Sequence, residues 1–428
     1  MKVRFIWILT SLFIVLALLA SCAPAATPTE EPTPVAEEPT AIPEEPTATA
    51  APELPAEPIK FGLLLVGPYN DHGWSQAHYD AGLYVQEKVA NTEMVYVDKV
   101  NPADRPGTTP AQLAEELLAQ GAKIIIFNSD DMKDSALEFA QAHPEIPVIH
   151  ASGDSSWQEG NDFKGIPNLS NIMGRMEYGK MIAGCAAALS TETGKIGYLG
   201  PLINDETRRL AASAYLGAQY CWTQVLGKPA TDLQFKVTWI GFWFNIPGVT
   251  SDPTQVADDF YNSGYDVVLS GIDTTEALTE AKKMAESGKK VWAIPYDFKG
   301  SCDEATEICL GVPYFNWGPA YSEYIQTVIT DGTIESFWAW NSPDWTDINN
   351  PDTSAVGFVK GAALSQEAAA KVDEFISAIA GGLNLWSGPI NLQDGTAYLA
   401  EGEVGTDQQV WYLPQLLQGM EGQSVPSE

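Results

Sequence analysis

The sequence predicts an α/β protein of two lobes, each with a parallel, doubly wound sheet covered by helices. The first observation is that short apolar runs alternate with amphipathic segments from Ile59 onward, which is the pattern of β-α-β units. The second is that runs such as GLLLV and KIIIF are apolar throughout, as strands buried on both faces of a sheet are. The third is that the alternation begins again near Ile172, so we expect two lobes in series with a cleft between them.

The first lobe is expected over residues 59–170. Its helices are predicted around Ala77 to Ala90, in PAQLAEELLAQG and in DSALEFAQAHP, and its strands in KFGLLLVG, EMVYVDKV, AKIIIFNS and IPVIHASG. Gly121 and Pro144 end the second and third helices, because glycine favours the position after a helix and proline cannot continue one.

The second lobe is expected over residues 171–310. It is predicted to hold helices in GRMEYGKMIAGCAAALS, NDETRRLAASAYLGAQYCWTQVLG, PTQVADDFYNSG and TTEALTEAKKMAESG, and strands in GKIGYLG, LQFKVTWIGFW, YDVVLSG and KKVWAIPYD. Residues 311–412 contain a strand in LGVPYF, a helix from Ala320 to Thr330 and a last strand-helix pair. We expect these segments to return and complete both lobes, and residues 413–428 to form a C-terminal tail.

The N-terminus has the features of an export signal. Lys2 and Arg4 precede an apolar run, and small residues follow it up to Cys22. Because LASC resembles a bacterial lipobox, residues 1–21 are interpreted as a lipoprotein signal peptide and Cys22 as the lipidated first residue of the mature protein. An ordinary cleaved signal that ends near a cysteine is the alternative.

Residues 22–58 are predicted to form a disordered stalk. They contain EEPT three times and no lysine, arginine, aromatic residue or glycine. Acidic, proline-rich sequence of this kind stays extended and unpacked. We therefore expect the folded part to be tethered by its lipid anchor to the extracytoplasmic face of the cell membrane.

The charge of the chain excludes one class of partner. The formal net charge is −33 at pH 7. A surface of this sign repels both nucleic acid and anionic lipid. We therefore expect no nucleic-acid partner.

Four cysteines remain when Cys22 is set aside, and an even number outside the cytoplasm favours disulfides. Cys302 and Cys309 bracket a short loop that a disulfide would close locally. Cys185 and Cys221 would then pair by elimination and tie one helix to the next. A metal site is the rival interpretation, but the chain has neither a CxxC motif nor a His/Cys cluster.

Polar and aromatic side chains gather where the predicted strands end, and in an open α/β sheet these ends form the crevice that binds ligands. Aromatic faces stack on a flat molecule while carboxylates and amides bond its edge, so we predict a cleft for a neutral or cationic, ring-bearing solute. Helix N-capping is the alternative role for any single Asp or Asn, and core packing for any single Trp. The ligand-binding residues predicted from these strand ends are Asn70, Asp71, Trp74, Ser129, Asp130, Trp243, Phe244, Asp273, Asp297, Asn316 and Trp317.

Signatures of catalysis were sought in the same residues. The chain has no GxSxG elbow, no P-loop and no HExxH motif. His72 and His78 lie six positions apart, which does not place them on one helical face for a metal. We expect a binding protein that is not an enzyme and that needs neither a cofactor nor a metal.

The chain resembles the basic membrane protein family of ABC-transporter solute-binding lipoproteins, which includes the purine nucleoside receptors. The resemblance rests on NDHGWSQAHYDAG, DSALEFAQAHPEIPVIHASG, MGRMEYGKMIAGCAAAL, GKIGYLG, TWIGFWFNIPGV and PDTSAVGFVKGA, and it covers roughly Ile59 to Asp394. It implies the type I periplasmic-binding-protein fold, in which two α/β lobes are joined by three crossovers around a ligand cleft.

The resemblance also implies roles for particular residues. Trp74 and Trp243 match the two aromatics that sandwich a nucleobase in the family. Asp134 matches an acidic residue after the third strand, and Asp297 matches an aspartate that binds the sugar. Two positions depart from the nucleoside-binding members, since Leu65 stands where they have an aspartate and Phe315 lies near the position of a lysine.

These observations predict a monomeric, lipid-anchored receptor that captures a small ring-bearing solute and delivers it to the permease and ATPase subunits of an ABC importer. A purine or nucleoside is the solute that the resemblance favours. Two alternatives stay open: a sensory receptor subunit that reports to a membrane partner, and the same scaffold binding a sugar or another non-purine solute.

Overall fold

The computed structural model describes residues 57–333 and 335–426, all of which belong to one compact unit, Leu54–Glu428. The predicted signal peptide, the lipidated Cys22 and nearly all of the predicted stalk therefore lie outside the described residues. Within the described ranges, no helix has both the length and the hydrophobicity that are needed to span a bilayer.

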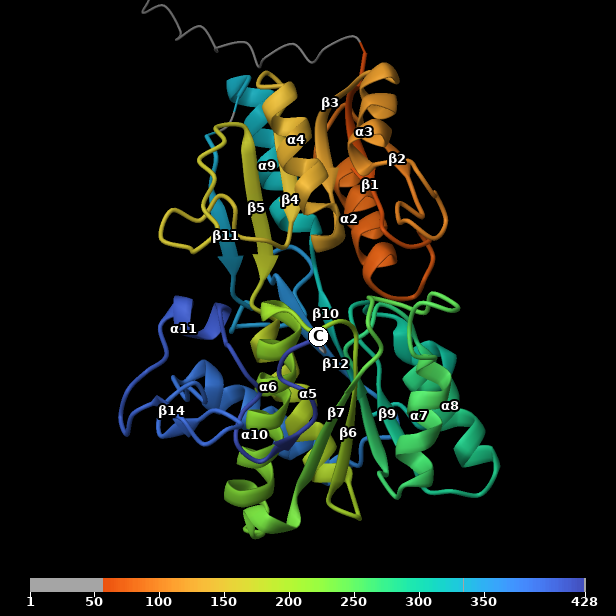
Figure 1. Ribbon diagram of the computed structural model, residues 1–428, viewed down its shortest axis with the longest axis vertical. Helices are drawn as coiled ribbons and strands as arrows, with labels where there is room; N and C mark the ends of the chain where they lie inside the picture. The colour runs from red at the N-terminus through yellow and green to blue at the C-terminus, as the bar shows by residue number, and fades with distance from the viewer. Residues whose placement is uncertain (1–56, 334, 427–428) are drawn as a thin grey trace, which may run out of the picture. The chain divides into compact units, whose positions relative to one another are not determined.

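The first lobe is a six-stranded parallel sheet covered by helices on both faces (Figure 1). Its strand order is β11-β5-β4-β3-β1-β2. Helices α2 and α9 pack against each other, and so do α3 and α4, which gives the doubly wound arrangement. The elements are β1 (Ile59–Leu64), α2 (Trp74–Lys88), β2 (Thr92–Val97), α3 (Pro110–Ala119), β3 (Ala122–Phe127), α4 (Lys133–Ala142), β4 (Val148–Ala151), β5 (Leu169–Gly174), α9 (Gly318–Asp331) and β11 (Trp338–Asn341).

The second lobe contains a five-stranded parallel sheet with the order β15-β7-β6-β8-β9. Helices α5 and α6 pack together, as do α7 and α8, and α10 packs against α5. The elements are α5 (Met176–Ser190), β6 (Lys195–Gly200), α6 (Asp205–Tyr220) with a π-helical end (Cys221–Val225), β7 (Gln234–Trp239), α7 (Pro253–Asn262), β8 (Val267–Ser270), α8 (Glu276–Glu286), β9 (Trp292–Ile294), α10 (Gln366–Ala380) and β15 (Met420–Glu421).

Smaller elements complete the second lobe. An antiparallel pair, β10 and β12, packs on α5, and a second antiparallel pair, β13 and β14, precedes a short C-terminal helix, α11. Single turns of 3₁₀-helix include one at Asp130–Met132 and one at Ser301–Glu304. The bounds of the named elements are β10 (Gly311–Phe315), β12 (Val356–Lys360), β13 (Ile390–Asn391), β14 (Ala397–Leu399) and α11 (Asp407–Trp411).

The chain crosses between the lobes three times, as expected for the type I periplasmic-binding-protein fold. The crossovers follow β5, β10 and β11, so they lie at Arg175, at residues 316–317 and at residues 342–355. The predicted fold class is confirmed by these sheets and by their connections. The carboxyl ends of the parallel strands in both lobes point toward the crossovers, where the cleft is formed.

Two boundaries differ from those expected. The first sheet extends to Gly174 rather than to residue 170, because β5 (LSNIMG) is a buried strand in spite of its polar residues. Asn171, for example, accepts a 2.8 Å hydrogen bond from the Ser156 amide and donates one of 3.1 Å to the Ser152 carbonyl. Residues 413–421 are also more than a tail, since Leu413 and Leu416 are buried and Met420 pairs with Phe235 of β7.

Candidate ligand-binding cleft

A narrow cavity lies between the two lobes at the strand ends, which is where α/β proteins of this kind bind ligands. The first lobe contributes side chains from the starts of two helical segments and from the end of β4. The second lobe contributes the start of α6 and the segments that follow β7, β8 and β9. The lining residues are Trp74, Ser129, Asp130, Ser152, Tyr198, Glu206, Thr207, Leu210, Trp243, Gly271, Asp273 and Tyr296.

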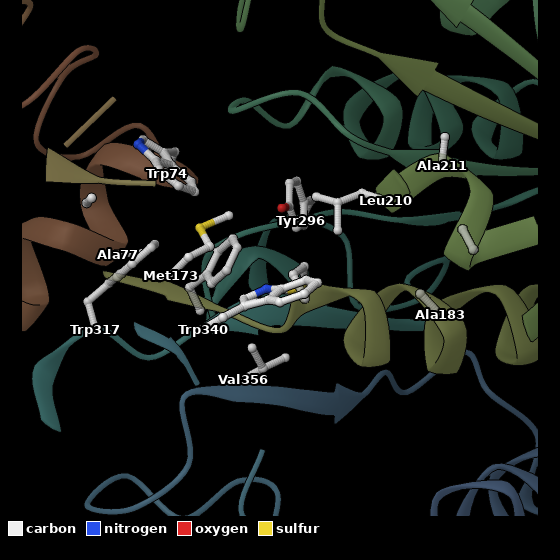
Figure 2. Packing of buried hydrophobic residues seen from close by; sticks show 14 of the residues in the cluster. Trp74, Ala77, Met173, Ala183, Leu210, Ala211, Tyr296, Trp317, Trp340 and Val356 are labelled. Carbon is white, nitrogen blue, oxygen red and sulfur yellow. The ribbon is translucent and has the colours of Figure 1, made fainter. Parts of the chain in front are cut away.

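Trp74 forms one wall of the cavity and is held from three sides. Its indole Nε1 donates a 2.6 Å hydrogen bond to the carbonyl of Asn128. The ring centroid of Phe315 lies 5.3 Å away in an edge-to-face contact at 90°, and His78 packs at 4.8 Å. Trp317 also packs on Trp74, with its ring centroid 5.3 Å away, and both side chains are drawn in Figure 2. The orientation of Trp74 is therefore fixed by protein contacts.

Trp243 forms part of the opposite wall and comes from the loop after β7. Its main-chain carbonyl accepts a 2.9 Å hydrogen bond from the amide of Asp273, which joins two of the segments that line the cavity. Its indole Nε1 is buried and has no hydrogen-bond partner among the residues that the structure describes. The two tryptophans that the sequence predicted as a pair thus line one cavity, each from a different lobe.

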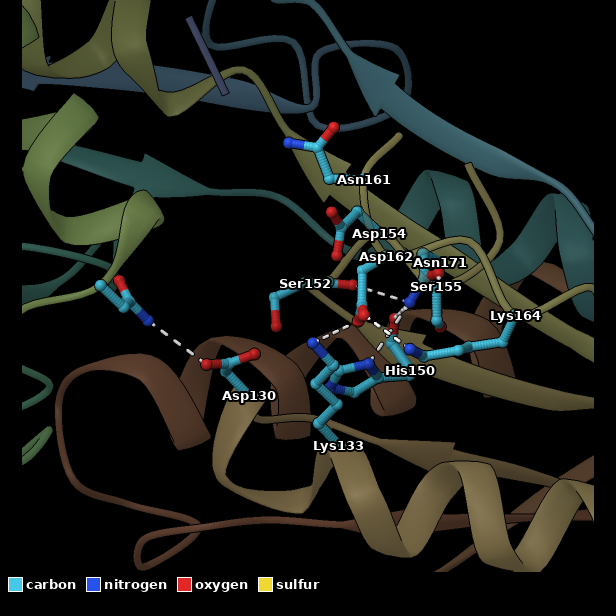
Figure 3. A network of polar contacts seen from close by, with 12 residues as sticks. Asp130, Lys133, His150, Ser152, Asp154, Ser155, Asn161, Asp162, Lys164 and Asn171 are labelled. Carbon is cyan, nitrogen blue, oxygen red and sulfur yellow. Dashed lines mark hydrogen bonds and ion pairs between the residues drawn. The ribbon is translucent and has the colours of Figure 1, made fainter. Parts of the chain in front are cut away.

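The two serines that line the cavity are positioned by a buried polar network, part of which is drawn in Figure 3. His150 Nε2 lies 2.9 Å from the carbonyl of Ser129, and Asn171 Nδ2 donates to the carbonyls of both His150 and Ser152. Burial lowers the pKa of His150, so the ring is neutral in this network. Nearby, the Lys133 ammonium pairs with Asp162.

The lobes are closed on each other around this cavity. His72 Nδ1 of the first lobe lies 2.5 Å from a carboxylate oxygen of Glu304, and the Ser301 hydroxyl donates a 2.8 Å bond to the His72 carbonyl. On the other side of the cleft, Asn204 Nδ2 lies 3.3 Å from a carboxylate oxygen of Asp130. The structure therefore represents the conformation in which a ligand would be enclosed.

Several buried polar atoms at this cavity have no partner within the described part of the chain. They are the Ser152 hydroxyl, the Trp243 indole nitrogen and the Tyr296 hydroxyl. Buried polar groups are normally hydrogen-bonded, because leaving one unpaired costs about 1–3 kcal/mol. A group of unpaired donors and acceptors around one cavity is what a site for a polar ligand provides when no ligand is bound.

The electrostatics of the cavity are dominated by carboxyl groups. Burial raises the pKa of Glu206 to about 7 and raises the pKa values of Asp273 and Asp297 well above their ordinary range. A buried Lys180 lies behind them, and burial lowers its pKa to about 7. The cavity thus combines two aromatic walls with buried carboxyl groups, Glu206 and Asp273, whose pKa values are raised by burial.

Asp71 and Asp297 were predicted to bind ligand and are not among the lining residues. Asp71 accepts hydrogen bonds from the amides of Gly73, Ser75 and Gln76, so it caps α2. Burial raises its pKa to about 6. Asp297 follows the lining residue Tyr296 and is fully buried outside the lining of the cavity.

Five other predicted residues lie outside the cavity. Asn70 and Asp134 are exposed, and Phe244 packs edge-to-face on Phe242. Asn316 donates to the carbonyls of Pro351 and Ser354, so it braces a crossover. Trp317 is buried and stacks on His78 at 4.3 Å, so it supports Trp74 from behind.

Seven lining residues were not predicted. Ser152 follows β4, and Glu206 and Thr207 lie at the start of α6, which follows β6. These residues therefore belong to two segments that follow strand ends, and the prediction did not include them. Tyr198 lies within a strand, and nothing in the sequence marks it. The complete set of unpredicted lining residues is Ser152, Tyr198, Glu206, Thr207, Leu210, Gly271 and Tyr296.

The cysteines form two disulfides. Cys185 on α5 is bonded to Cys221 at the end of α6, and Cys302 is bonded to Cys309. Among the residues that the structure describes, no cluster of three or more His, Cys, Asp or Glu side chains could hold a metal ion.

Two α/β lobes closed on a cavity with aromatic walls and unpaired polar groups define a solute-binding protein. A family profile described as ABC transporter substrate-binding protein, PnrA-like, matches residues 59–342. The chain belongs to this family, Bmp, and is therefore an extracytoplasmic substrate-binding protein that delivers a small molecule to the permease and ATPase subunits of an ABC transporter. Because the family consists of substrate-binding proteins, the expectation that this chain is not an enzyme is confirmed.

Two curated relatives are similar in sequence. A purine-binding protein of Brucella abortus (strain 2308) is 27% identical over 355 residues, which covers 82% of this chain and 90% of the relative. A putative ABC transporter glucose-binding protein of Haloferax volcanii is 26% identical over 290 residues, which covers 66% of this chain and 64% of the relative.

Solved structures support the same fold. A solute-binding protein of an ABC transporter system from Aeropyrum pernix K1 matches with a TM-score of 0.59 at 14% identity, covering 78% of this chain and 93% of that protein. One from Conexibacter woesei matches with a TM-score of 0.53 at 12% identity, covering 76% of this chain and 97% of that protein.

Proposed function

We propose that this protein is a lipid-anchored receptor whose solute is a purine or a purine nucleoside. The observation that carries the proposal is that Trp74 and Trp243 line one cavity from opposite lobes. Stacking of a base on an aromatic side chain contributes about 1–3 kcal/mol and needs a flat ring with two free faces. The relative from Brucella abortus is a purine-binding protein, which agrees with this choice.

The unpaired polar atoms supply the edge contacts that a purine ligand needs. Within the described part of the chain, Trp243 Nε1 and the Tyr296 hydroxyl line the cavity without a hydrogen-bond partner, so both could donate to a ligand. Aromatic stacking would fix the plane of the ring, while these groups would fix its rotation within that plane. Lobe closure by hinge motion at the three crossovers would then enclose the ligand.

This chain differs from the nucleoside-binding members at two positions that would hold the ligand by polar contacts. The two tryptophans that would stack on the ligand are present. Leu65 is fully buried, and Phe315 packs edge-to-face against Trp74. Neither side chain can accept or donate a hydrogen bond, so polar recognition would depend on lining residues such as Ser152, Trp243 and Tyr296. A sugar is the second candidate solute, because the relative from Haloferax volcanii is titled as glucose-binding and the carboxyl groups at the cavity suit hydroxyl donors.

A thermal-shift screen of the purified full-length protein tests the choice of solute. Purines, nucleosides, sugars and amino acids would be added at equal concentrations, and a ligand at 100 times its Kd should stabilise the fold by about 2.7 kcal/mol. We expect a response to purines or nucleosides. A response confined to sugars would replace the proposed solute and keep the site.

Anchoring through Cys22 is proposed on the basis of the sequence LASC and the acidic, proline-rich segment that follows it. Cell fractionation of the Cys22→Ser variant tests the anchor. The account expects a folded protein that the membrane no longer retains. A variant that stays in the membrane fraction would mean that the apolar N-terminal segment itself is the anchor.

A further inference from the structure

The segment of residues 405–413, called the C-terminal arm below, contains α11 and is fixed to the second lobe. Arg208 Nε on α6 donates a 2.8 Å hydrogen bond to the carbonyl of Leu413. The Tyr398 hydroxyl on β14 donates a 2.5 Å hydrogen bond to the carbonyl of Gln409. Because both bonds stay within the second lobe, the C-terminal arm moves with that lobe when the cleft opens or closes.

The C-terminal arm reaches the first lobe through the hydroxyl group of Tyr412. This hydroxyl donates a hydrogen bond to the Asp154 carboxylate and accepts one of 2.7 Å from the amide of Asn161. The side-chain amide of Gln408 donates to the carbonyl of Glu159. The three first-lobe partners all belong to the loop between β4 and β5, and two of them, Asp154 and Asn161, are drawn in Figure 3. One short loop of the first lobe is therefore bonded at three points.

Aromatic rings extend the same contact. The ring of Tyr412 stacks on Trp157, with centroids 5.7 Å apart and planes 6° apart, and Trp157 stacks in turn on Trp338 of β11 at 4.1 Å. Trp411 packs edge-to-face on Trp338 at 5.3 Å. Trp157 and Trp411 are both buried. Since buried aromatic pairs are favourable, these rings stabilise the arrangement in which the C-terminal arm meets the first lobe.

The loop that the C-terminal arm contacts also contributes to the ligand cavity. Ser152, which lines the cavity, belongs to the same loop as Asp154. Asn171 of β5 ties this loop together, because it bonds to the carbonyl of Ser152 and to the amide of Ser156. The contact is thus a link between the lobes beside the cavity, in addition to the three covalent crossovers.

We propose that Tyr412 is a positioning residue for solute capture, whose hydroxyl group joins the C-terminal arm to Asp154 and Asn161 and thereby favours the closed arrangement of the lobes. The crossovers connect the lobes in every state, whereas this bond forms only where the arm meets the loop. Asp154 is 6% exposed, so its bond with the hydroxyl is shielded from water, and hydrogen bonds to carboxylates are among the stronger ones in proteins. The role does not depend on which solute binds.

Chemical cross-linking of the closed lobes tests the proposal without a solute. The full-length Cys22→Ser protein is the background, because the other native cysteines are held in disulfides. His72→Cys and Glu304→Cys place thiols where two side chains meet across the cleft, since His72 Nδ1 lies 2.5 Å from a Glu304 oxygen. A short bis-maleimide joins the thiols when the lobes are closed, so the cross-linking rate measures the closed fraction. Tyr412→Phe should slow this rate about fivefold or more.

Tyr398→Phe is the matched control, because it removes a tyrosine hydroxyl bond to the same arm that does not cross between the lobes. Its cross-linking rate should equal that of the background. Gln408→Ala, at an exposed residue, should slow cross-linking in the same direction as Tyr412→Phe, and it decides the question if Tyr412→Phe does not fold. An unchanged rate in both arm variants, or equal slowing by Tyr398→Phe, would overturn the proposal.

Stopped-flow kinetics with adenosine as the probe separates this inference from the proposed function. In Tyr412→Phe, adenosine should dissociate about fivefold faster and associate at nearly the wild-type rate, because the bond forms when the lobes close over the solute. A loss of affinity through association alone would overturn the role of Tyr412. Failure of the wild type to bind adenosine would count against the proposed solute, and the cross-linking rates would still decide the role of Tyr412.

Discussion

The indole nitrogen of Trp74 lies 2.6 Å from the main-chain carbonyl of Asn128 and donates a hydrogen bond to it. This bond joins the first turn of α2 to the end of β3, so two adjacent loops of the first lobe share one fixed ring. Phe315 and His78 support the same ring. A wall that is ordered before the ligand arrives loses less conformational entropy on binding, which favours affinity.

Trp74→Ala should weaken purine or nucleoside binding by about 1–3 kcal/mol, because it removes one stacking face. Trp74→Phe should retain a larger share of the affinity, since it keeps an aromatic face and loses only the bond to Asn128. Titration calorimetry of the two variants checks the order. Phe163→Ala, at a residue 44% exposed, is the control that should leave binding unchanged. Affinity of the wild-type value in Trp74→Ala would remove the stacking role.

Gly73→Ala should block full closure of the lobes. A Cβ at this position would lie 1.7 Å from the carbonyl oxygen of Asp273 in the opposite lobe, a distance that no real contact reaches. Because the obstruction exists only in the closed state, we expect weaker ligand binding and an unchanged melting temperature of the ligand-free protein. Calorimetry and thermal unfolding measure the two effects.

The control for this prediction is Gly381→Ala, where the added Cβ would be 3.2 Å from the nearest atom, the Ser377 carbonyl oxygen. That variant should bind ligand normally. Tight binding by Gly73→Ala would mean that the ligand-bound state is more open than the structure described above.

The fold could be predicted because most of its buried strands have sequences that are apolar at nearly every position. KIIIF and GLLLV become β3 and β1 of the first sheet, with nearly every residue buried. β5 was harder to place, since Ser170 and Asn171 are polar and are buried only because tertiary partners satisfy them. Such partners come from loops that are distant in sequence, so a local pattern cannot show them.

The cavity could be predicted in part, because the sequence shows where the strands end. Trp74, Trp243 and Asp273 follow strands, and topology alone brings strand ends together. Tyr198 lies inside β6, and it reaches the cavity only because Gly271 beside it has no side chain to fill the space. Asp71 shows the converse case, in which a strand-end carboxylate caps a helix instead of lining the cavity.

Glu206 should make the stability of the ligand-free protein depend on pH. Burial raises its pKa from 4.5 to about 7, so the folded state binds this proton more tightly than the unfolded state does. The free energy of unfolding should therefore decrease as the pH rises from 4.5 to about 7. Glu206→Gln should reduce this slope by up to about 1.4 kcal/mol per pH unit, the value for one proton.

Urea unfolding between pH 4 and 8 measures the slope for the wild type and for Glu206→Gln. The exposed Glu401 supplies the control variant Glu401→Gln, which should leave the slope unchanged. Parallel curves for the wild type and Glu206→Gln would show that Glu206 titrates at the same pH in both states.

The two disulfides should contribute unequally to stability. The Cys185–Cys221 bond spans 36 positions and the Cys302–Cys309 bond spans 7. On the loop-entropy account, their contributions are about 4 and about 2 kcal/mol. Replacing each pair by alanine and measuring urea unfolding should show the larger loss for the first pair, and the reverse order would contradict the entropic explanation.

The most direct test of the central claim is calorimetric titration of the full-length wild-type protein with adenosine, guanosine, hypoxanthine and glucose. We expect saturable binding of one purine or nucleoside per chain, abolished or strongly weakened when Trp74 and Trp243 are both replaced by alanine. Saturable binding of glucose with no response to any purine would contradict it, and would show that this fold and its two tryptophans serve a different solute.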